Sequence, residues 1–302
     1  MPHALIMSAI APPQVPLRGG YVLIDRSNLE SDTFAAPLPM LPCLPPILSR
    51  ADDLMPCLID VAALSSGQQD MLGQALLRGS DCEKPPALCG WLESAEDAAT
   101  VAGHIARFLV GPDASGGLVF WRYHDPRVMA LTLSLFSPAQ TEALLGPISA
   151  WRFVWCRRWW SATGSGRAVD PVSGYRPAWP GPEQWASLAH SELITDVLRR
   201  LQNDGGRLSD AQCLQCQRDI DRMLHHARST LKLSKHEDLA EYAFDGMRYG
   251  EAFHRHPKLT AAWPGLAQAH ISWSEVRALL NHSDYRALDQ EAESRYFKRL
   301  AT

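Results

Sequence analysis

Short apolar runs recur through the first half of the chain, and turn-forming glycine, proline and serine residues separate them. Runs of this length that are rich in Val, Ile and aromatic residues are typical of buried β-strands. The pattern predicts strands over residues 21–25, 57–61, 87–92, 118–123 and 151–156.

Helical patterns lie between several of these predicted strands. Apolar residues recur at helical spacing from Ala98 to Leu109, and Ser94 is placed to cap that helix. Further along, Ser137 with Gln140 has the spacing of a capping box, and Gly146 is suited to end the helix that follows. Helices that alternate with strands predict a sheet covered by helices.

Beyond residue 181 the apolar pattern is helical throughout. A helix is predicted over Pro182–Gln202, and another over Ser283–Leu300 at the end of the chain. Between them, Ser209, Ser234 and Ser272 each precede a helical pattern as a predicted N-cap. This part of the chain is therefore expected to be a helical bundle.

These patterns together predict an α+β protein. We expect a flexible tail over residues 1–19 and an α/β lobe with a mixed β-sheet flanked by helices over residues 20–160. A Gly-, Ser- and Pro-rich linker is expected over residues 161–181, and an all-α helical lobe over residues 182–302.

Composition narrows the functional classes. The 302 residues are 46% hydrophobic and 21% charged, as in ordinary globular proteins, and the net charge is −4. Because neither half has a basic excess, nucleic acid is a poor candidate partner. The sequence contains no apolar stretch long enough to span a membrane, and residues 1–16 lack the features of a signal peptide.

The cysteines favour a cytoplasmic protein with reduced, mostly buried thiols, because their number, seven, is odd and their spacing is irregular. Cys213 and Cys216, followed by His225 and His226, are the most suggestive metal constellation. However, one uninterrupted helix places His225 roughly 13 Å beyond Cys216, too far to close a tetrahedral site. We therefore expect these residues to be half-buried thiols and surface histidines, and we expect no metal site in the chain.

The segment from Arg122 to Arg127 offers two interpretations. As a catalytic site, His124 would act as a base oriented by Asp125, and the arginines would bind an anion. As a structural joint, Asp125 would cap a helix over residues 127–136, because Asp is a preferred N-cap and Pro126 suits the first helical position. Capping alone accounts for the Asp-Pro pair, so the structural interpretation is favoured.

Tryptophan is the remaining anomaly of the composition. Ten occur in the chain, and four of these cluster at positions 151, 155, 159 and 160. Tryptophan is enriched at interaction hot spots, but a large aromatic core would explain the same cluster equally well.

Five segments occur in an order that resembles the effector chaperones of bacterial type VI secretion, also called adaptors of the Tap or TEC type. The segments are Tyr21–Asp25, Pro56–Asp60, Gly90–Ser94, Phe120–Val128 and Leu145–Ile148, and the resemblance covers residues 20–160. Its most specific element is the stretch of arginine, an aromatic residue, one further residue and Asp-Pro-Arg-Val. His124 departs from the aromatic residue common at its position.

The resemblance implies a cytoplasmic, cofactor-free chaperone or adaptor of a Gram-negative bacterium. Such a protein binds a toxic effector and helps to load it onto the spike protein, VgrG. Arg122, Asp125 and Arg127 fall on the family motif, whether they contact the effector or only build the joint. Candidate partner-binding residues are Trp121, Arg122, Tyr123, Asp125, Arg127, Trp151, Trp155, Trp159 and Trp160.

Three functional hypotheses follow. The first is a non-enzymatic chaperone that binds a cognate effector and VgrG, with no nucleic-acid partner and no membrane insertion. The second is a small-molecule enzyme with a site at the His124–Asp125 joint or in a cleft near Trp151–Trp160. The third is a structural component of the secretion assembly, which would associate with itself.

Overall fold

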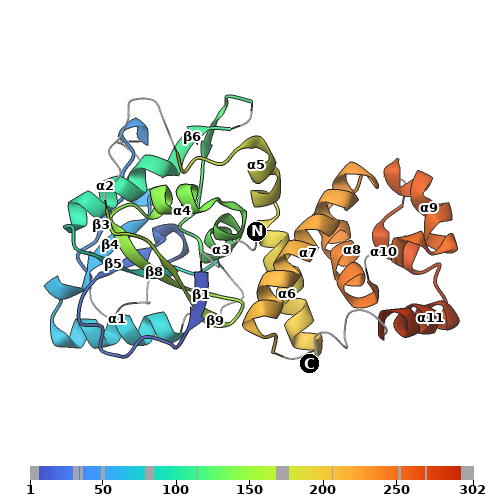
Figure 1. Ribbon diagram of the computed structural model, residues 1–302, viewed down its shortest axis with the longest axis horizontal. Helices are drawn as coiled ribbons and strands as arrows, with labels where there is room; N and C mark the ends of the chain where they lie inside the picture. Colours follow the sequence, from blue (N-terminus) through green and yellow to red (C-terminus); the bar gives the residue numbers. More distant parts are fainter. Residues whose placement is uncertain are drawn as a thin grey trace. The chain divides into compact units, whose positions relative to one another are not determined.

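The computed structural model describes residues 7–29, 34, 37–48, 52–78, 85–113, 115–167, 177–205, 207–250, 253–268 and 271–293. Its contacts divide the chain into two compact units, Met1–Leu188 and Ala189–Thr302. The first contains a β-sheet with helices, and the second is helical in its described residues (Figure 1). The predicted α+β class is confirmed.

The first unit is built on a seven-stranded sheet in which every described pairing is antiparallel. The strand order is β1-β9-β8-β5-β2-β4-β3. The strands are β1 (Met7–Ile10), β2 (Tyr21–Ile24), β3 (Leu41–Pro42), β4 (Cys57–Asp60), β5 (Leu88–Ser94), β8 (Ile148–Trp155) and β9 (Arg158–Thr163).

The alternation of strands and helices had predicted a mixed sheet. That prediction is wrong, because every described strand pairing is antiparallel. A single crossover helix between neighbouring strands produces a parallel pair. Here the connection from β5 to β8 contains a hairpin and three helices, and the chain re-enters the sheet in the opposite direction. The apolar pattern of β8 would be the same in either direction, so it could not show that β8 runs antiparallel to β5.

The expected flexible tail contains an ordered strand. Strand β1 pairs with β9, with Met7 opposite Ala162 and Ile10 opposite Trp159. The strand was missed because the prolines that follow it suggested a loose segment, whereas its ladder partner lies about 150 residues further along the chain. Residues 1–6 lie outside the described part of the structure.

Helices cover both faces of the sheet (Figure 1). Helix α1 (Ser66–Arg78) packs on one face, where its Leu72 and Leu76 join a buried cluster with Val22 and Ile59. The opposite face is covered by three helices: α2 (Ala98–Leu109), α3 (Pro126–Leu135) and α4 (Pro138–Leu145). Because helices cover both faces of the sheet, the side chains of β2 are buried at every position.

Local signals placed most of the helix starts, with one exception in this unit. The capping box of Ser137 and Gln140 forms as predicted, and Gly146 ends α4 with a φ of 51°. Ser94, however, ends β5 and donates to the Pro147 carbonyl at 2.7 Å, so Asp97 caps α2 instead. Ser94 and Asp97 are both residue types that cap helices, but Ser94 is the last residue of strand β5.

A small hairpin replaces part of the strand predicted over residues 118–123. Strand β7 (Leu118–Phe120) pairs with β6 (Val110–Pro112) in a separate two-stranded sheet. The residues after Phe120 turn into α3 and leave the strand conformation.

The boundary between the units differs from the predicted linker. Residues 161–163 complete β9, residues 168–176 lie outside the described part, and α5 (Pro182–Leu188) belongs to the first unit. Contacts hold α5 there: Gln184 donates to the Leu135 carbonyl at 3.0 Å, and Trp185 packs on Trp121. Residues 182–188, predicted as the start of the helical lobe, are therefore attached to the sheet unit through Leu135 of α3 and Trp121.

The second unit contains six described α-helices in chain order. They are α6 (Ser191–Gly205), α7 (Asp210–Ser229), α8 (His236–Tyr249), α9 (Pro257–Ala267), α10 (Trp273–Arg277) and α11 (His282–Glu293). The capping boxes at Ser209 and Ser272 form as predicted. At α8 the N-cap is Lys235, without a side-chain cap, rather than Ser234.

Two further features of this unit bear on the sequence. The helix predicted over residues 182–202 is interrupted at Ala189–His190, between α5 and α6. Gly246 lies on α8 against Met223 of α7, at a point of close helix packing. Within the described residues, none of the helices combines the length and the apolar character that crossing a membrane would need.

Candidate functional site

The Arg122–Arg127 segment forms a rigid joint where the hairpin leads into α3. Asp125 is the N-cap of α3, with Pro126 at the first helical position, and Asp125 Oδ1 accepts from the Arg127 amide at 2.9 Å. The Arg127 side chain folds back on the same carboxylate, with Nη2 to Oδ2 at 2.7 Å. The predicted cap is confirmed, and Arg127 is the arginine that pairs with it.

Arg122 pairs with a different carboxylate, that of Asp25 at the end of β2. Asp25 is buried and caps a 3-10 turn, η1 (Arg26–Asn28). Its Oδ1 accepts from the Ser27 hydroxyl at 2.6 Å, and its Oδ2 accepts from Asn28 Nδ2 at 3.1 Å and from the Arg122 guanidinium. The joint thus connects the end of β2, an interior strand of the sheet, to the segment that leads into α3.

These donors keep Asp25 charged in a buried position. Burial alone would raise the pKa of Asp25, but hydrogen bonds from His124 and Ser27 and the positive charge of Arg122 outweigh it and lower the pKa to about 2. A buried carboxylate with this many donors is a fixed, pre-organised group. It holds Arg122 in place while 42% of the Arg122 side chain remains exposed.

The geometry does not assemble the catalytic arrangement considered for this segment. His124 is buried, and its Nε2 lies 3.4 Å from Asp25 Oδ2, so Asp25 rather than Asp125 orients it. Both oxygens of Asp125 accept from Arg127. A base in this position has no exposed surface on which to meet a substrate.

Aromatic side chains surround the joint. Trp121 and Tyr123 are buried, their ring centroids lie 4.9 Å apart, and the Tyr123 hydroxyl donates to the Ile105 carbonyl at 3.0 Å. Trp121 also packs against Trp179 and Trp185, with centroids 5.6 and 5.7 Å away. Trp121 and Tyr123 therefore fix the hairpin and α5 against the sheet unit.

The tryptophan cluster lies in the sheet and not on the surface. Trp151, Trp155, Trp159 and Trp160 are all buried, and Trp160 Nε1 donates to the Trp155 carbonyl at 2.9 Å. Burial is the property expected of an aromatic core, the alternative considered for these residues. In this arrangement they offer no exposed face to a partner.

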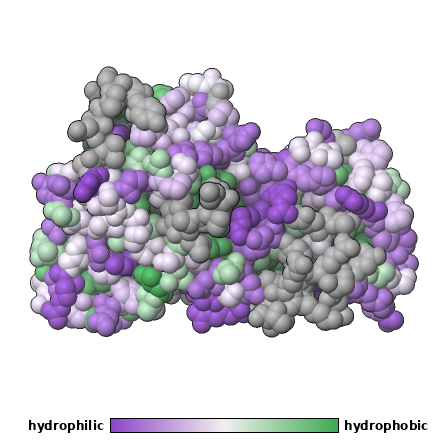
Figure 2. Space-filling model, in the orientation of Figure 1, coloured by the Kyte–Doolittle hydropathy of each residue, from purple (hydrophilic) through white to green (hydrophobic). Residues whose placement is uncertain are grey.

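The surface above the joint has other features. Turn η1, which Asp25 caps, contacts a second 3-10 turn, η3 (Asp52–Leu54). Leu54 is exposed there, as are Ile47 on the preceding segment and Leu118 on the hairpin. Figure 2 shows apolar residues scattered over the sheet unit among polar ones on the face drawn. Of these exposed side chains, Leu54 lies on the turn that contacts η1, whose cap Asp25 also binds the half-exposed Arg122.

Sequence reasoning missed the central member of the joint. Asp25 was predicted only as the last residue of the strand over residues 21–25, and its pairing with Arg122 spans 97 positions. A carboxylate directly after a fully apolar run was the available signal, because such a group must either be capped or paired. The contribution of Trp179 and Trp185 was missed because Trp179 lies in the predicted linker and Trp185 on a helix predicted for the helical lobe.

Comparison with known proteins gives one match. Neither the search of curated proteins nor the search of solved structures found a match to the chain. Residues 47–143 match the family described as "Domain of unknown function (DUF4123)". The matched range is less than half of the chain, and it contains the whole Arg122–Arg127 segment of the joint.

Proposed function

We propose that this protein is a type VI secretion effector chaperone, or adaptor, and not an enzyme. The observation that carries the proposal is the match of residues 47–143 to the DUF4123 family, known for effector chaperones of this kind. The resemblance of residues 20–160 to the same class of chaperones agrees with this match and extends beyond its boundaries. In this role the protein acts in the cytoplasm of a Gram-negative bacterium.

The proposed activity has two steps. The chaperone binds and stabilises its cognate effector, and it then helps to load the effector onto the spike protein, VgrG. Both steps need protein contacts and no cofactor. The half-exposed Arg122 and the exposed apolar residues Ile47 and Leu54 are the surface groups best suited to them, since arginine and apolar anchors are favoured in interfaces.

The geometry of the joint supports binding better than catalysis. Asp25 fixes one end of the Arg122 side chain, so little conformational freedom is lost when the guanidinium meets a partner carboxylate or carbonyl. His124, in contrast, is enclosed. A pre-positioned arginine on a rigid scaffold is suited to recognition.

The first experiment is co-expression with the protein encoded by the neighbouring gene, followed by affinity purification and size exclusion. We expect a stable complex, and an effector that is less soluble when expressed alone. Failure to bind any neighbouring gene product or VgrG, by a folded monomer, would contradict the proposal. A chain that instead assembles only with itself would favour a structural role.

Substitution tests the binding surface. Arg122→Ala and Leu54→Asp should weaken the complex, by about tenfold or more for a residue at the centre of an interface. Arg78→Ala on α1 is the matched control, because Arg78 is also an exposed arginine but lies on the helix that covers the other face of the sheet. If all three variants bind as well as the parent protein, the interface does not include Arg122 or Leu54.

A further inference from the structure

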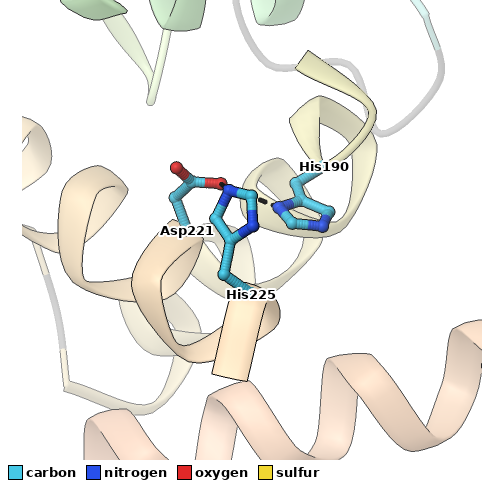
Figure 3. Close-up of side chains that lie close together, drawn as sticks. All are labelled: His190, Asp221 and His225. Carbon is cyan, nitrogen blue, oxygen red and sulfur yellow. Dashed lines mark hydrogen bonds and ion pairs between the residues drawn. The ribbon is translucent and has the colours of Figure 1, made fainter. Parts of the chain in front are cut away.

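Three potential metal ligands converge in the helical unit. His190 precedes α6, whereas Asp221 and His225 lie one turn apart on α7 (Figure 3). His190 Nδ1 lies 2.7 Å from Asp221 Oδ1, and His225 Nε2 lies 3.6 Å from the same oxygen. One ligand atom from each residue lies within 4.8 Å of the others.

Two elements of the chain build this cluster. The i,i+4 spacing puts Asp221 and His225 on one face of α7, and the break between α5 and α6 brings His190 to them. Residue 190 is also the start of α6, since its carbonyl accepts from the Ile194 amide at 2.9 Å. The cluster therefore connects the start of one helix to the middle of the next.

Burial is graded across the cluster. His190 is buried, Asp221 is 14% exposed, and His225 is 42% exposed. The rings of His190 and His225 lie with centroids 4.7 Å apart at a steep angle. A cation here would be held from the interior by His190 and would be reached from solvent on the His225 side.

The ligand types select the class of metal. Two imidazoles and one carboxylate suit Zn²⁺ and its transition-metal neighbours, whereas Mg²⁺ and Ca²⁺ prefer oxygen ligands throughout. Tetrahedral Zn²⁺ with bonds of about 2.1 Å needs its ligand atoms roughly 3.4 Å apart. The observed separations of 2.7 and 3.6 Å lie on either side of that value.

We propose that His190, Asp221 and His225 form a transition-metal site that binds Zn²⁺, with water completing the fourth position. Binding would bring the three ligand atoms, which already lie within 4.8 Å of one another, to the tetrahedral separation. His190 comes to Asp221 Oδ1 from another segment of the chain, and His225 comes to the same oxygen from the next turn of α7. The metal would fasten the α6 start to α7.

This site uses different residues from the constellation considered in the sequence. Cys213 and Cys216 are buried in α7, and burial raises the pKa of Cys216 to about 12, so that thiol stays protonated. His226 packs against Tyr242 and His254 instead. Of the four residues in that constellation, only His225 is a ligand here, and it meets partners that lie outside the Cys-His pattern.

Zn²⁺ titration of the full-length chain tests the site. After treatment with a chelator, the protein should bind one Zn²⁺ per chain at high affinity in a competition with a chromogenic indicator. Asp221→Asn and His225→Ala should each weaken that binding by about 100-fold or more, since each removes one of three protein ligands. The exposed His236 at the start of α8 provides the control, and His236→Ala should bind Zn²⁺ as the parent does.

A thermal melt supplies an independent measurement. A ligand that binds only the folded state raises its stability, so Zn²⁺ should raise the Tm of the parent and of His236→Ala, but not of His225→Ala. His225 is the safest position to vary because it is the most exposed of the three. Unchanged Zn²⁺ affinity in both ligand variants, or no binding by the parent, would overturn the proposal.

Discussion

Two buried aspartates, one in each unit, have opposite electrostatic behaviour. Asp25 in the sheet unit and Asp245 in the helical unit are equally buried. Asp25 accepts from Ser27, Asn28, His124 and Arg122, and its pKa falls to about 2. Burial raises the pKa of Asp245 to about 6, even though Arg277 and the Trp273 indole contact it.

The number and sharing of donors explains this difference. Asp245 has one oxygen, Oδ1, without a hydrogen-bond partner among the described residues. Its arginine is also shared, because Arg277 pairs with Glu241 as well, and Arg200 joins Glu241 at 2.8 Å. A buried carboxylate is therefore stable in its charged form only where donors occupy both oxygens and no second acid competes for them.

The largest expected effect follows from removing the Asp25 carboxylate, which accepts hydrogen bonds from Ser27, Asn28 and Arg122. Asp25→Ala should lower the free energy of unfolding of the sheet unit by about 3–5 kcal/mol, because it leaves buried donors and a cation without their acceptor. Hydrogen exchange in the β2, β5 and α3 amides is the appropriate measurement, since it separates this unit from the helical one.

Asp60→Ala is the matched control for that variant. Asp60 also ends a strand of the same sheet and caps a 3-10 turn, but its cap is exposed and accepts from the Ala62 amide. We expect a loss of about 1 kcal/mol. Similar losses for both variants would mean that capping alone, and not the ion pair with Arg122, accounts for the stability that Asp25 contributes.

The second prediction concerns pH and Asp245. A raised folded-state pKa contributes stability that is fully present below pH 3.8 and is lost as the pH rises through about 6. Asp245→Asn removes this dependence, so the stability of the variant relative to the parent should rise by about 2–3 kcal/mol between pH 4 and pH 8. Urea unfolding at several pH values gives the difference.

Asp25 should respond in the opposite sense over a more acidic window. Its contribution is present above pH 3.8 and is lost as the pH falls through about 2. The Asp25→Ala deficit should therefore shrink as the pH falls from about 4 towards 2. A deficit that instead grows over that acidic interval would contradict the contrast between the two carboxylates.

Two glycines extend the comparison to packing. A Cβ on Gly20 would lie 2.4 Å from the Leu92 carbonyl oxygen, at a φ of 78°, whereas a Cβ on Gly246 would meet the Met223 sulfur at 2.4 Å. Backbone cannot move aside, but a methionine side chain can. Gly20→Ala should cost about 2–3 kcal/mol and Gly246→Ala about 1 kcal/mol or less, measured by denaturant unfolding.

The smallest expected effect is equal in the two units. Ser137 and Ser209 form the same capping box at the starts of α4 and α7. Ser→Ala at either position should cost about 1 kcal/mol in thermal or urea unfolding, because each cap satisfies one helix N–H. Clearly unequal costs would show that the surroundings of a box, such as the Gln140–Gln184 contact, matter as much as the box itself.

Features encoded within a few residues could be predicted from the sequence. The Asp125-Pro126 start of α3 and the boxes at Ser137, Ser209 and Ser272 needed only short-range chemistry. Ser94 is the instructive failure, because two residues with cap chemistry lay close together and the sheet used one of them. Local propensity could not decide between them.

Features that depend on long-range pairing could not be predicted in this way. The antiparallel direction of β5 and β8, the β1–β9 ladder and the pairing of Asp25 with Arg122 each join distant segments. The same holds for His190 with Asp221, which meet only because the chain breaks between α5 and α6. A single sequence contains both partners of each pair but no mark that connects them.

The β1–β9 ladder has a consequence for synthesis on the ribosome. The strand that completes the ladder of β1 is synthesised about 150 residues after β1 itself. At roughly 5–20 residues per second, the first strand waits on the order of ten seconds with an unpaired backbone edge. Until β9 has been made, β1 therefore lacks its ladder partner, and its backbone N–H and C=O groups stay open to pairing with another chain.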